Sequence, residues 1–228
     1  MPSPSRSDRL AQLSRARLYL VTGATPAAGP LGDVVAAAVR GGVDLVQLRM
    51  KDADSDADLL DAAAVVRRAC RAAGALFVLN DRPDLARAAD ADAVHVGQDD
   101  LPVDEARALA GPSVLVGVST HSADDLDRAW LDRADYVGVG PVHATPTKPG
   151  RPAVGLDYVR HAAASAATLP WFAIGGIDLS NVHAVRAAGA RRIAVVRAIT
   201  DASDPAAAER SARALRAAIT EETPVGTT

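Results

Sequence analysis

Short hydrophobic runs alternate with longer segments of helical periodicity along almost the whole chain. Each run is rich in Val, Leu and Ile and precedes an alanine-, leucine- and arginine-rich segment, the order typical of parallel strands joined by crossover helices. The runs occupy residues 17–23, 44–50, 75–80, 93–97, 113–119, 135–140, 171–176 and 192–198. Eight such units predict a single compact α/β domain, a (β/α)8 TIM barrel, which normally needs about 200 residues or more.

Two of the helical segments have clear boundaries. Residues 56–74 and 178–189 both end at glycine, the residue that most often follows the last turn of a helix. The second segment has Asp178 and Ser180 near its start, and both residue types are good N-caps. We therefore expect helices over these two ranges.

An open, doubly wound sheet is the competing architecture. It would usually carry a glycine-rich dinucleotide fingerprint after the first strand, but the chain has VTGATPAAGP at residues 21–30. We therefore favour the barrel, and the sequence shows no domain boundary inside it. We expect a flexible N-terminal segment at residues 1–16, the barrel domain at 17–220 and a disordered tail at 221–228.

Composition and charge narrow the classes of function. The net charge of −3 gives no electrostatic basis for binding nucleic acid or an anionic membrane. No stretch approaches the roughly 18 apolar residues of a membrane span, and the polar N-terminus lacks the apolar core of an export signal. The single cysteine, Cys70, is interpreted as a buried apolar residue in a cytoplasmic protein without an internal disulfide. The sequence leaves the oligomeric state open, a homo-oligomer included.

Polar side chains end the second predicted strand. In VQLRMK, residues 46–51, strand alternation separates Gln47, Arg49 and Lys51 on one face from Leu48 and Met50 on the other. The apolar pair suits the layer against the helices, so the polar three would point into the barrel or its mouth. Because an unpaired buried charge is very costly, the two cations need either an ion pair with a neighbouring strand or a bound anion. We favour the anion.

Carboxylates follow the third and fourth predicted strands. Asn80 and Asp81 close one apolar run, and Asp99 and Asp100 follow the next. Each aspartate would be a good N-cap for the helix expected after it, the first of which can begin at Pro83. Adjacent parallel strands end at the same edge of a sheet, so Asp81 and Asp100 would repel one another unless a cation lay between them. Few carboxylates with open positions for phosphate oxygens suit Mg²⁺.

The fifth predicted strand ends in GVSTHS, residues 117–122. Alternation places Gly117, Ser119 and His121 on one face. Ser119 would be a neutral donor and acceptor at the rim of the barrel. His121 is more readily explained as a packed or capping residue than as an acid or base.

A second candidate anion site follows the seventh and eighth strands, where such barrels often hold a phosphate. Gly175 and Gly176 would let backbone N–H groups approach a ligand closely, near the start of a helix. Val196 and Arg197 end the last strand. Two phosphorylated substrates would account for two anion sites.

The stretch GPVHATPTKPG, residues 140–150, is a proline- and glycine-rich loop after the sixth strand. Pro146 biases Thr145 toward an extended conformation, so Thr145 and Thr147 should project alike, with Lys148 beside them. Long loops in compact domains are usually functional or disordered.

Seven segments, in this order, carry a resemblance to a known family. They are QLRMK, LNDRPDLA, VHVGQDDLP, GVSTHS, DYVGVGPVHATPTKPGRPAVGL, FAIGGI and VVRAI. Together they resemble the thiamine-phosphate synthases, also called thiamine-phosphate pyrophosphorylases, over about residues 17–200. Several phosphate-binding barrels share single pieces such as AIGGI, whereas the ordered set is specific.

The resemblance implies a (β/α)8 transferase that uses one Mg²⁺ ion per active site. Such an enzyme joins 4-amino-2-methyl-5-(diphosphooxymethyl)pyrimidine to hydroxyethylthiazole phosphate, giving thiamine phosphate and pyrophosphate. Pyrophosphate would leave first, in a dissociative step, and the thiazole nitrogen would then attack. No general base is required, because that nitrogen already has a free lone pair.

The resemblance also implies roles for individual residues. The pyrimidine diphosphate would be bound by Gln47, Leu48, Arg49, Met50, Lys51, Asn80, Ser119 and Lys148. Of these, Arg49, Lys51, Ser119 and Lys148 would be catalytic. The thiazole phosphate would be bound by Thr145, Thr147, Gly176, Val196 and Arg197, and the metal by Asp81 and Asp100. The family varies at position 197, so a backbone contact is expected there, while His121 and His143 receive no role.

Three alternatives have different signatures. A thiazole tautomerase-like relative would keep the barrel and the phosphate loops but lack the diphosphate and metal residues. A non-catalytic thiazole-phosphate binding protein would also have no need of them. A sugar-phosphate isomerase would need an acid–base pair across the mouth of the barrel. The intact set of cations and carboxylates favours the synthase.

Overall fold

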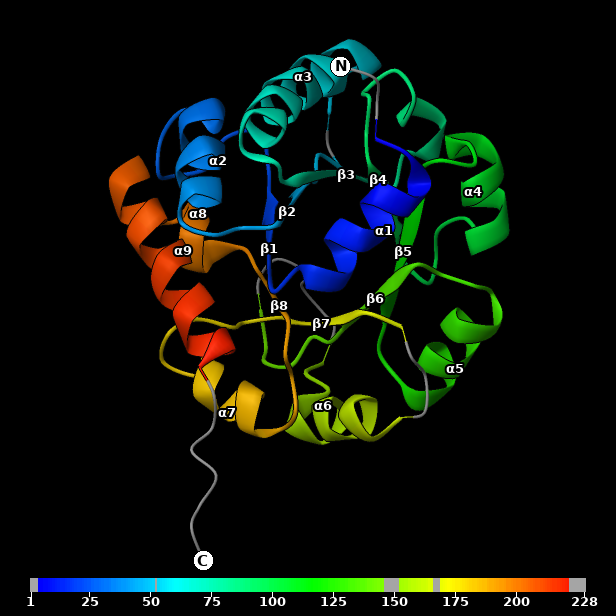
Figure 1. Ribbon diagram of the computed structural model, residues 1–228, viewed down its shortest axis with the longest axis vertical. Helices are drawn as coiled ribbons and strands as arrows, with labels where there is room; N and C mark the ends of the chain where they lie inside the picture. The colour runs from blue at the N-terminus through cyan, green and yellow to red at the C-terminus, as the bar shows by residue number, and fades with distance from the viewer. Residues whose placement is uncertain (1–3, 52, 146–151, 166–168, 222–228) are drawn as a thin grey trace, which may run out of the picture.

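The computed structural model describes residues 4–51, 53–145, 152–165 and 169–221. Within them, eight parallel strands close into a barrel in chain order, with β8 paired to β1 (Figure 1). The strands are β1 (Leu18–Thr22), β2 (Leu45–Leu48), β3 (Leu76–Asn80), β4 (Ala93–Val96), β5 (Leu115–Thr120), β6 (Tyr136–Val139), β7 (Trp171–Ile174) and β8 (Ile193–Val195). Each lies on one of the predicted hydrophobic runs, so the (β/α)8 fold is confirmed.

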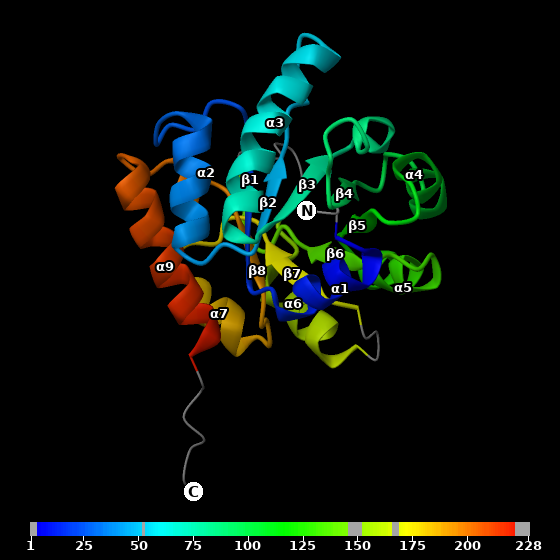
Figure 2. The same cartoon turned by 45° about the horizontal axis from the view of Figure 1, so that its top comes forward.

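Helices surround the barrel on its outer side (Figures 1 and 2). They are α2 (Leu31–Arg40), α3 (Asp56–Ala73), α4 (Val103–Ala110), α5 (Ala123–Leu131), α6 (Gly155–Ala164), α7 (Val182–Ala187), α8 (Arg197–Thr200) and α9 (Pro205–Thr220). Between β3 and β4 the described chain forms a 3-10 helix, η1 (Pro83–Leu85), which begins at Pro83 as expected. No helix in the described ranges is long and apolar enough to cross a membrane.

The two predicted helix boundaries had different outcomes. The segment 56–74 forms α3, whose first turn is capped by the Ser55 hydroxyl and whose end is followed by Gly74 in the left-handed conformation. The segment 178–189 was predicted too long, because α7 begins only at Val182. The Asp178 carboxylate is occupied within the preceding turn, where it accepts hydrogen bonds from the N–H and hydroxyl of Ser180. Neither residue caps the helix.

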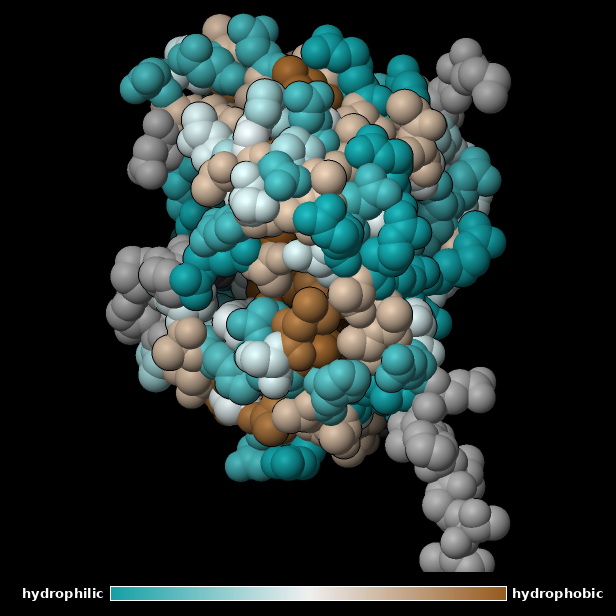
Figure 3. Space-filling model, turned by 90° about the vertical axis from the view of Figure 1, so that its left-hand side faces the viewer, coloured by the Kyte–Doolittle hydropathy of each residue, from teal (hydrophilic) through white to brown (hydrophobic). Residues whose placement is uncertain are grey.

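The apolar residues form two layers, one outside the barrel wall and one inside it. The outer layer packs the strands against the helices and contains Cys70, which is fully buried as predicted. The inner layer includes the rings of Tyr19, Tyr136 and Phe172. The side of the molecule that carries α2 and α9 presents mostly polar and weakly hydrophobic residues, with a small strongly hydrophobic group near its middle (Figure 3).

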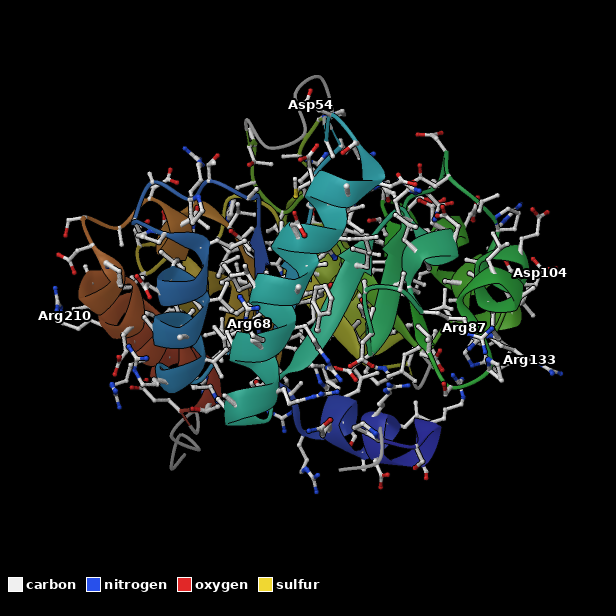
Figure 4. All side chains as sticks on the ribbon, turned by 90° about the horizontal axis from the view of Figure 1, so that it is seen from above. Asp54, Arg68, Arg87, Asp104, Arg133 and Arg210 are labelled. Carbon is white, nitrogen blue, oxygen red and sulfur yellow. The ribbon has the colours of Figure 1, made fainter. Side chains whose placement is uncertain are left out.

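The N-terminal segment differs from the flexible stretch expected at residues 1–16. Residues 6–15 form α1 (Arg6–Arg15), which begins with a capping box made by Ser5 and Asp8. Leu13 is fully buried in the inner layer, and Figure 4 shows α1 across the barrel from the loop that carries Asp54. This helix therefore closes the end of the barrel at which the strands begin. The tail predicted at 221–228 lies, apart from its first residue, outside the described ranges.

Three aspartates repeat one arrangement at the same end of the barrel. Each stands directly before an even-numbered strand in a DLV, DAV or DYV triplet, and its carboxylate accepts a backbone N–H from the preceding odd-numbered strand. The pairs are Asp44 with Leu18 at 2.9 Å, Asp92 with Phe77 at 3.0 Å and Asp135 with Val116 at 2.7 Å. Arginine side chains from the helices neutralise each carboxylate. These contacts stabilise the strand pairing at the end of the barrel that α1 closes.

Asp92 is the most deeply buried of the three, with its side chain 3% exposed. It pairs with Arg9 of α1 at 3.0 Å and with Arg67 of α3 at 2.5 Å. Removing one member of a buried ion pair leaves the others without compensation. We expect Asp92→Ala to lower the free energy of unfolding by about 3–5 kcal/mol, measured by urea denaturation.

Asp157→Ala is the matched control, because Asp157 pairs with Arg160 on an exposed helix surface where its side chain is 96% exposed. Such a pair contributes less than about 1 kcal/mol. Equal losses in the two variants would contradict the importance assigned to the buried cluster.

Candidate active site

A cavity of about 280 Å³ opens at the carboxyl ends of the strands. All eight strands contribute to it, through their last residues or the loops that follow. The predicted site residues among its lining are Gln47, Arg49, Asn80, Ser119, Thr145, Gly176, Val196 and Arg197. The structure thus brings together residues that lie up to 150 positions apart in the chain.

The predicted alternation along β2 is confirmed. Gln47 and Arg49 line the cavity, whereas Leu48 is fully buried in the outer layer and Met50 packs against that layer. Leu48 and Met50 were expected to bind the pyrimidine diphosphate, but neither is part of the cavity lining. Any contact they make with a ligand would have to come from the backbone.

The two cations that follow this strand differ in their partners. The Lys51 ammonium lies 2.7 Å from the Asp81 carboxylate, so Lys51 forms an ion pair with the residue that follows the neighbouring strand. Arg49 has no ion pair with any residue in the described part of the chain and projects into the cavity lining. Asp81 does not cap η1, whose first turn lacks a side-chain cap. Its φ of 57° places it in the left-handed region, which is uncommon for aspartate.

Asp100 folds back onto the end of its own strand. Its carboxylate accepts the backbone N–H of Gly97 at 2.7 Å, and it does not cap α4, which begins after Pro102 without a side-chain cap. A Cβ at Gly97 would lie 2.8 Å from this carboxylate oxygen, so the position favours glycine. Since β3 and β4 pair in parallel, Asp81 and Asp100 follow neighbouring strands at the same end of the barrel.

These two carboxylates fit a magnesium ion better than a metal that needs a full protein cage. No cluster of three or more His, Cys, Asp or Glu side chains suited to a metal occurs among the described residues. Mg²⁺ prefers oxygen donors and commonly takes one or two carboxylates, with phosphate and water oxygens filling the other positions. The Lys51 ammonium against Asp81 already shows a positive charge accommodated at this position.

A chain of buried polar groups forms the floor of the cavity, and all of its members except Tyr136 belong to the cavity lining. The Gln47 amide donates to the Tyr19 hydroxyl at 2.5 Å, and the hydroxyls of Tyr19 and Tyr136 are 3.1 Å apart. His95 contacts the Tyr136 hydroxyl through Nδ1 at 3.3 Å and the Ser119 hydroxyl through Nε2 at 3.0 Å. Burial raises the pKa of both tyrosines well above the ordinary value, so both hydroxyls keep their protons. The chain links β2 to β5 through β1, β6 and β4.

His121 and His143 each form hydrogen bonds with neighbouring loop segments. The His121 ring contacts the Gly140 carbonyl through Nδ1, and its backbone N–H donates to Asp125 at 2.8 Å, so the packed interpretation of this residue is supported although it also lines the cavity. The His143 backbone N–H donates to the Gly175 carbonyl at 3.0 Å. These contacts fix the loop after β6 against its neighbours.

Gly175 and Gly176 are required by this loop as well as by any ligand. Gly175 has φ of 107°, and a Cβ there would lie 2.5 Å from Pro141. Gly176 has φ of 62°, and its Cβ would lie 2.8 Å from the His143 Cβ. The close approach seats the loop up to Thr145 against β7. Thr147 and Lys148, also predicted in the site, lie outside the described residues.

Comparison with known proteins agrees with this arrangement. The family model described as thiamine monophosphate synthase matches residues 18–199, which is most of the chain. The chain belongs to the thiamine monophosphate synthase family.

Relatives with this family's name are similar over nearly their full length. The thiamine-phosphate synthase of Streptomyces avermitilis is 52% identical over 218 residues, covering 95% of this chain and 99% of that protein. The corresponding protein of Acidothermus cellulolyticus is 53% identical over 213 residues, covering 91% and 99%. The thiamine phosphate pyrophosphorylase structure from Pyrococcus furiosus superposes with a TM-score of 0.80 at 31% identity, covering 91% of this chain and 96% of that one.

Sequence reasoning missed three polar residues at the floor of the cavity in this member of the thiamine monophosphate synthase family. Tyr19, His95 and Tyr136 all lie inside predicted strands, and His95 belongs to the VHVG segment that marks the resemblance. A signal was available, because a polar side chain on the inward face of an apolar strand needs a buried partner. The partners themselves come from other strands and could not be identified from spacing.

The close contact between Gly175 and Pro141 gives a stability prediction. Gly175→Ala should lower the free energy of unfolding by about 2–5 kcal/mol, because it adds overpacking to left-handed backbone strain. Gly74→Ala is the matched control, since Gly74 has φ of 73° but no atom within 4 Å of the added Cβ. The control should lose only about 1 kcal/mol. Thermal or urea unfolding measures both, and similar losses would show that the loop contact is unimportant.

Proposed function

We propose that this chain joins 4-amino-2-methyl-5-(diphosphooxymethyl)pyrimidine to hydroxyethylthiazole phosphate, releasing thiamine phosphate and pyrophosphate. The observation that carries the proposal is the single cavity lined by both predicted sets of residues. Gln47, Arg49 and Ser119 come from β2 to β5, and Thr145, Gly176 and Val196 come from the loops after β6 to β8. In a closed barrel these are opposite halves of the rim, so each half can hold one substrate.

The pyrimidine diphosphate belongs to the half formed by β2 to β5. Arg49 is well suited to a diphosphate, because its planar guanidinium donates in a fixed fork and has no carboxylate partner among the described residues. Lys51, whose side chain is 46% exposed and paired with Asp81, is proposed as a second cation for the diphosphate. Lys148 is proposed as a third cation on the strength of the family motif alone.

The thiazole phosphate belongs to the other half, next to the first turn of α8. The first N–H groups of a helix have no acceptor within it, so those near Val196 and Arg197 are available to phosphate oxygens. Thr145 adds a hydroxyl and Gly176 permits close approach of backbone. Arg197 is exposed at the rim, where its charge adds to a contact made by backbone.

Catalysis in this arrangement is electrostatic stabilisation of a leaving group. Negative charge develops on pyrophosphate as the carbon–oxygen bond breaks, and preorganised cations act most strongly where charge develops. Mg²⁺ bound by Asp81 and Asp100 would neutralise part of that charge. Ser119 and Gln47 orient the pyrimidine ring, and the loop up to Thr145 holds the thiazole nitrogen toward the reacting carbon. The nitrogen needs no general base, so the proposed reaction requires no acid–base pair in the cavity.

The alternative functions require a different set of charged residues. A thiazole tautomerase-like relative or a non-catalytic thiazole-phosphate binding protein has no use for Arg49, Lys51, Asp81 and Asp100, which this chain brings to one end of the barrel. We also propose a cytoplasmic location, which agrees with the single buried Cys70. A homo-oligomer is proposed as well, with no interface assigned to it.

A direct assay tests the proposed function. The purified protein is mixed with both substrates and Mg²⁺, and thiamine phosphate and pyrophosphate are quantified. We expect both products in equal amounts, and we expect a chelator to abolish their formation and added Mg²⁺ to restore it. Folded protein that forms neither product would refute the synthase proposal and leave the binding-protein alternative.

The metal assignment has its own test. Asp81→Ala and Asp100→Ala should each lower kcat by about 10² or more at limiting Mg²⁺, by analogy with the loss of one preorganised electrostatic element. Asp104→Asn is the control, because Asp104 lies exposed on α4, on the outer side of the barrel (Figure 4). Near wild-type activity of both alanine variants, with the same Mg²⁺ dependence, would show that the metal lies elsewhere.

A further inference from the structure

The polar chain at the floor of the cavity has a direction that follows from counting its protons. The Gln47 Nε2 donates to the Tyr19 hydroxyl, so the oxygen of Tyr19 is already an acceptor. The remaining hydrogen-bond neighbour of Tyr19 is Tyr136, at 3.1 Å, and the single proton of Tyr19 must point there. Both rings are almost completely buried, which makes an unpaired hydroxyl proton costly.

The same reasoning continues through the next two groups. Tyr136 accepts from Tyr19 and therefore donates its own proton to Nδ1 of His95, 3.3 Å away. A neutral imidazole whose Nδ1 accepts carries its proton on Nε2. Nε2 then donates to the Ser119 hydroxyl at 3.0 Å.

The opposite direction leaves the proton of Tyr19 without an acceptor in the described protein. If Ser119 donated to His95 and each later group donated onward, Tyr19 would accept from both Tyr136 and Gln47. Its own proton would then find no acceptor among the polar groups of the described chain that contact it. In a reversed chain the Gln47 amide would have to be turned by 180°, so that its carbonyl oxygen accepts the proton of Tyr19. That turn would present the NH2 group of Gln47 to the cavity in place of the carbonyl oxygen.

Four members of the chain, Tyr19, Gln47, His95 and Ser119, line the cavity. Gln47 of β2 and Ser119 of β5 are its two ends, and each has hydrogen-bonding capacity that the chain leaves unused. One of the two Nε2 protons of Gln47 is donated to Tyr19, which fixes the orientation of the amide and leaves its carbonyl oxygen as the acceptor for a ligand. With the Ser119 oxygen accepting from His95, its proton is the donor left for a ligand.

We propose that this one-way chain selects a 4-aminopyrimidine over a 4-oxopyrimidine, with His95 and Tyr136 as positioning residues. The inference rests on the proposed function and adds to it the basis of ring recognition. An amino group donates to the Gln47 carbonyl, and a ring nitrogen lone pair accepts from Ser119. A 4-oxo group instead brings a second carbonyl oxygen against Gln47, and one buried acceptor stays unpaired. Sites built on such hydrogen bonds discriminate far more strongly than sites built on shape.

The first experiment reads the direction of the chain without any substrate. Protein labelled with ¹⁵N in its five histidines is examined by NMR, and His95→Gln identifies the signals of His95. We expect Nδ1 to give the signal of an unprotonated ring nitrogen and Nε2 that of a protonated one at neutral pH. The opposite tautomer, or an imidazolium, overturns the proposal. Because no catalysis is involved, this result stands apart from the activity assay.

The second experiment measures ring selection as binding, so that the role of the amino group in bond cleavage does not enter. Dissociation constants are measured by calorimetry, with Mg²⁺, for 4-amino-2-methyl-5-(phosphooxymethyl)pyrimidine and its 4-oxo counterpart. The wild type should prefer the amino compound by about a hundredfold, and Tyr136→Phe should reduce that preference about tenfold. Tyr158→Phe is the control, because the Tyr158 hydroxyl donates to the Ser122 carbonyl at 2.6 Å, away from the cavity lining.

Unfolding temperatures and circular dichroism establish that the variants fold. If Tyr136→Phe does not fold, Tyr19→Phe breaks the same chain one step earlier and should show the same reduced preference. An unchanged preference in a folded variant overturns the proposal, even where the tautomer is as expected. A wild type that binds both rings equally also overturns it, whereas failure of product formation alone bears on the proposed reaction.

Discussion

The aromatic rings packed edge-on inside the barrel are the constraint on which the site depends. Tyr19, Tyr136 and Phe172 lie with ring centres 5.3–6.1 Å apart. Tyr136 reaches this position only because Gly117, on the neighbouring strand, lacks a side chain: a Cβ there would lie 2.1 Å from the ring. The rings belong to the inner layer of the barrel, and those of Tyr19 and Phe172 line the cavity at the carboxyl ends of the strands. The cavity therefore begins where the aromatic inner layer of the barrel ends.

Charged residues at the two ends of the barrel differ in how completely they are paired. At the closed end, Asp44, Asp92 and Asp135 are saturated by backbone N–H groups and arginines, so these charges stabilise the closure and are unavailable to a ligand. At the open end the charges are less fully paired, and Arg49 has no carboxylate partner within the described chain. The same residue types thus serve structure at one end and would serve anion binding at the other under the proposed function, according to how completely they are neutralised.

Local pattern was sufficient for the fold and for part of the site. The eight strands follow from hydrophobic runs, and the inward positions of Gln47, Arg49 and Ser119 follow from strand alternation. What could not be predicted depends on contacts between distant segments. The N-terminal helix looked like a polar tail because its order comes from Arg9 and Leu13 packing against the barrel. The beginning of α7 was misplaced because Asp178 is engaged by its own turn.

The division between the floor and the charged rim of the cavity explains how one pocket could recognise a pyrimidine ring as well as the phosphate groups of two substrates. The rim carries formal charges, which attract any phosphorylated molecule and distinguish poorly between rings. The floor carries the hydroxyls of Tyr19 and Tyr136, which keep their protons because burial raises their pKa values. A neutral donor and acceptor held in fixed positions can distinguish an amino group from a carbonyl oxygen, which charge alone cannot. Under the proposed function, phosphate affinity at the rim and ring recognition at the floor would therefore be separate properties of the same barrel end.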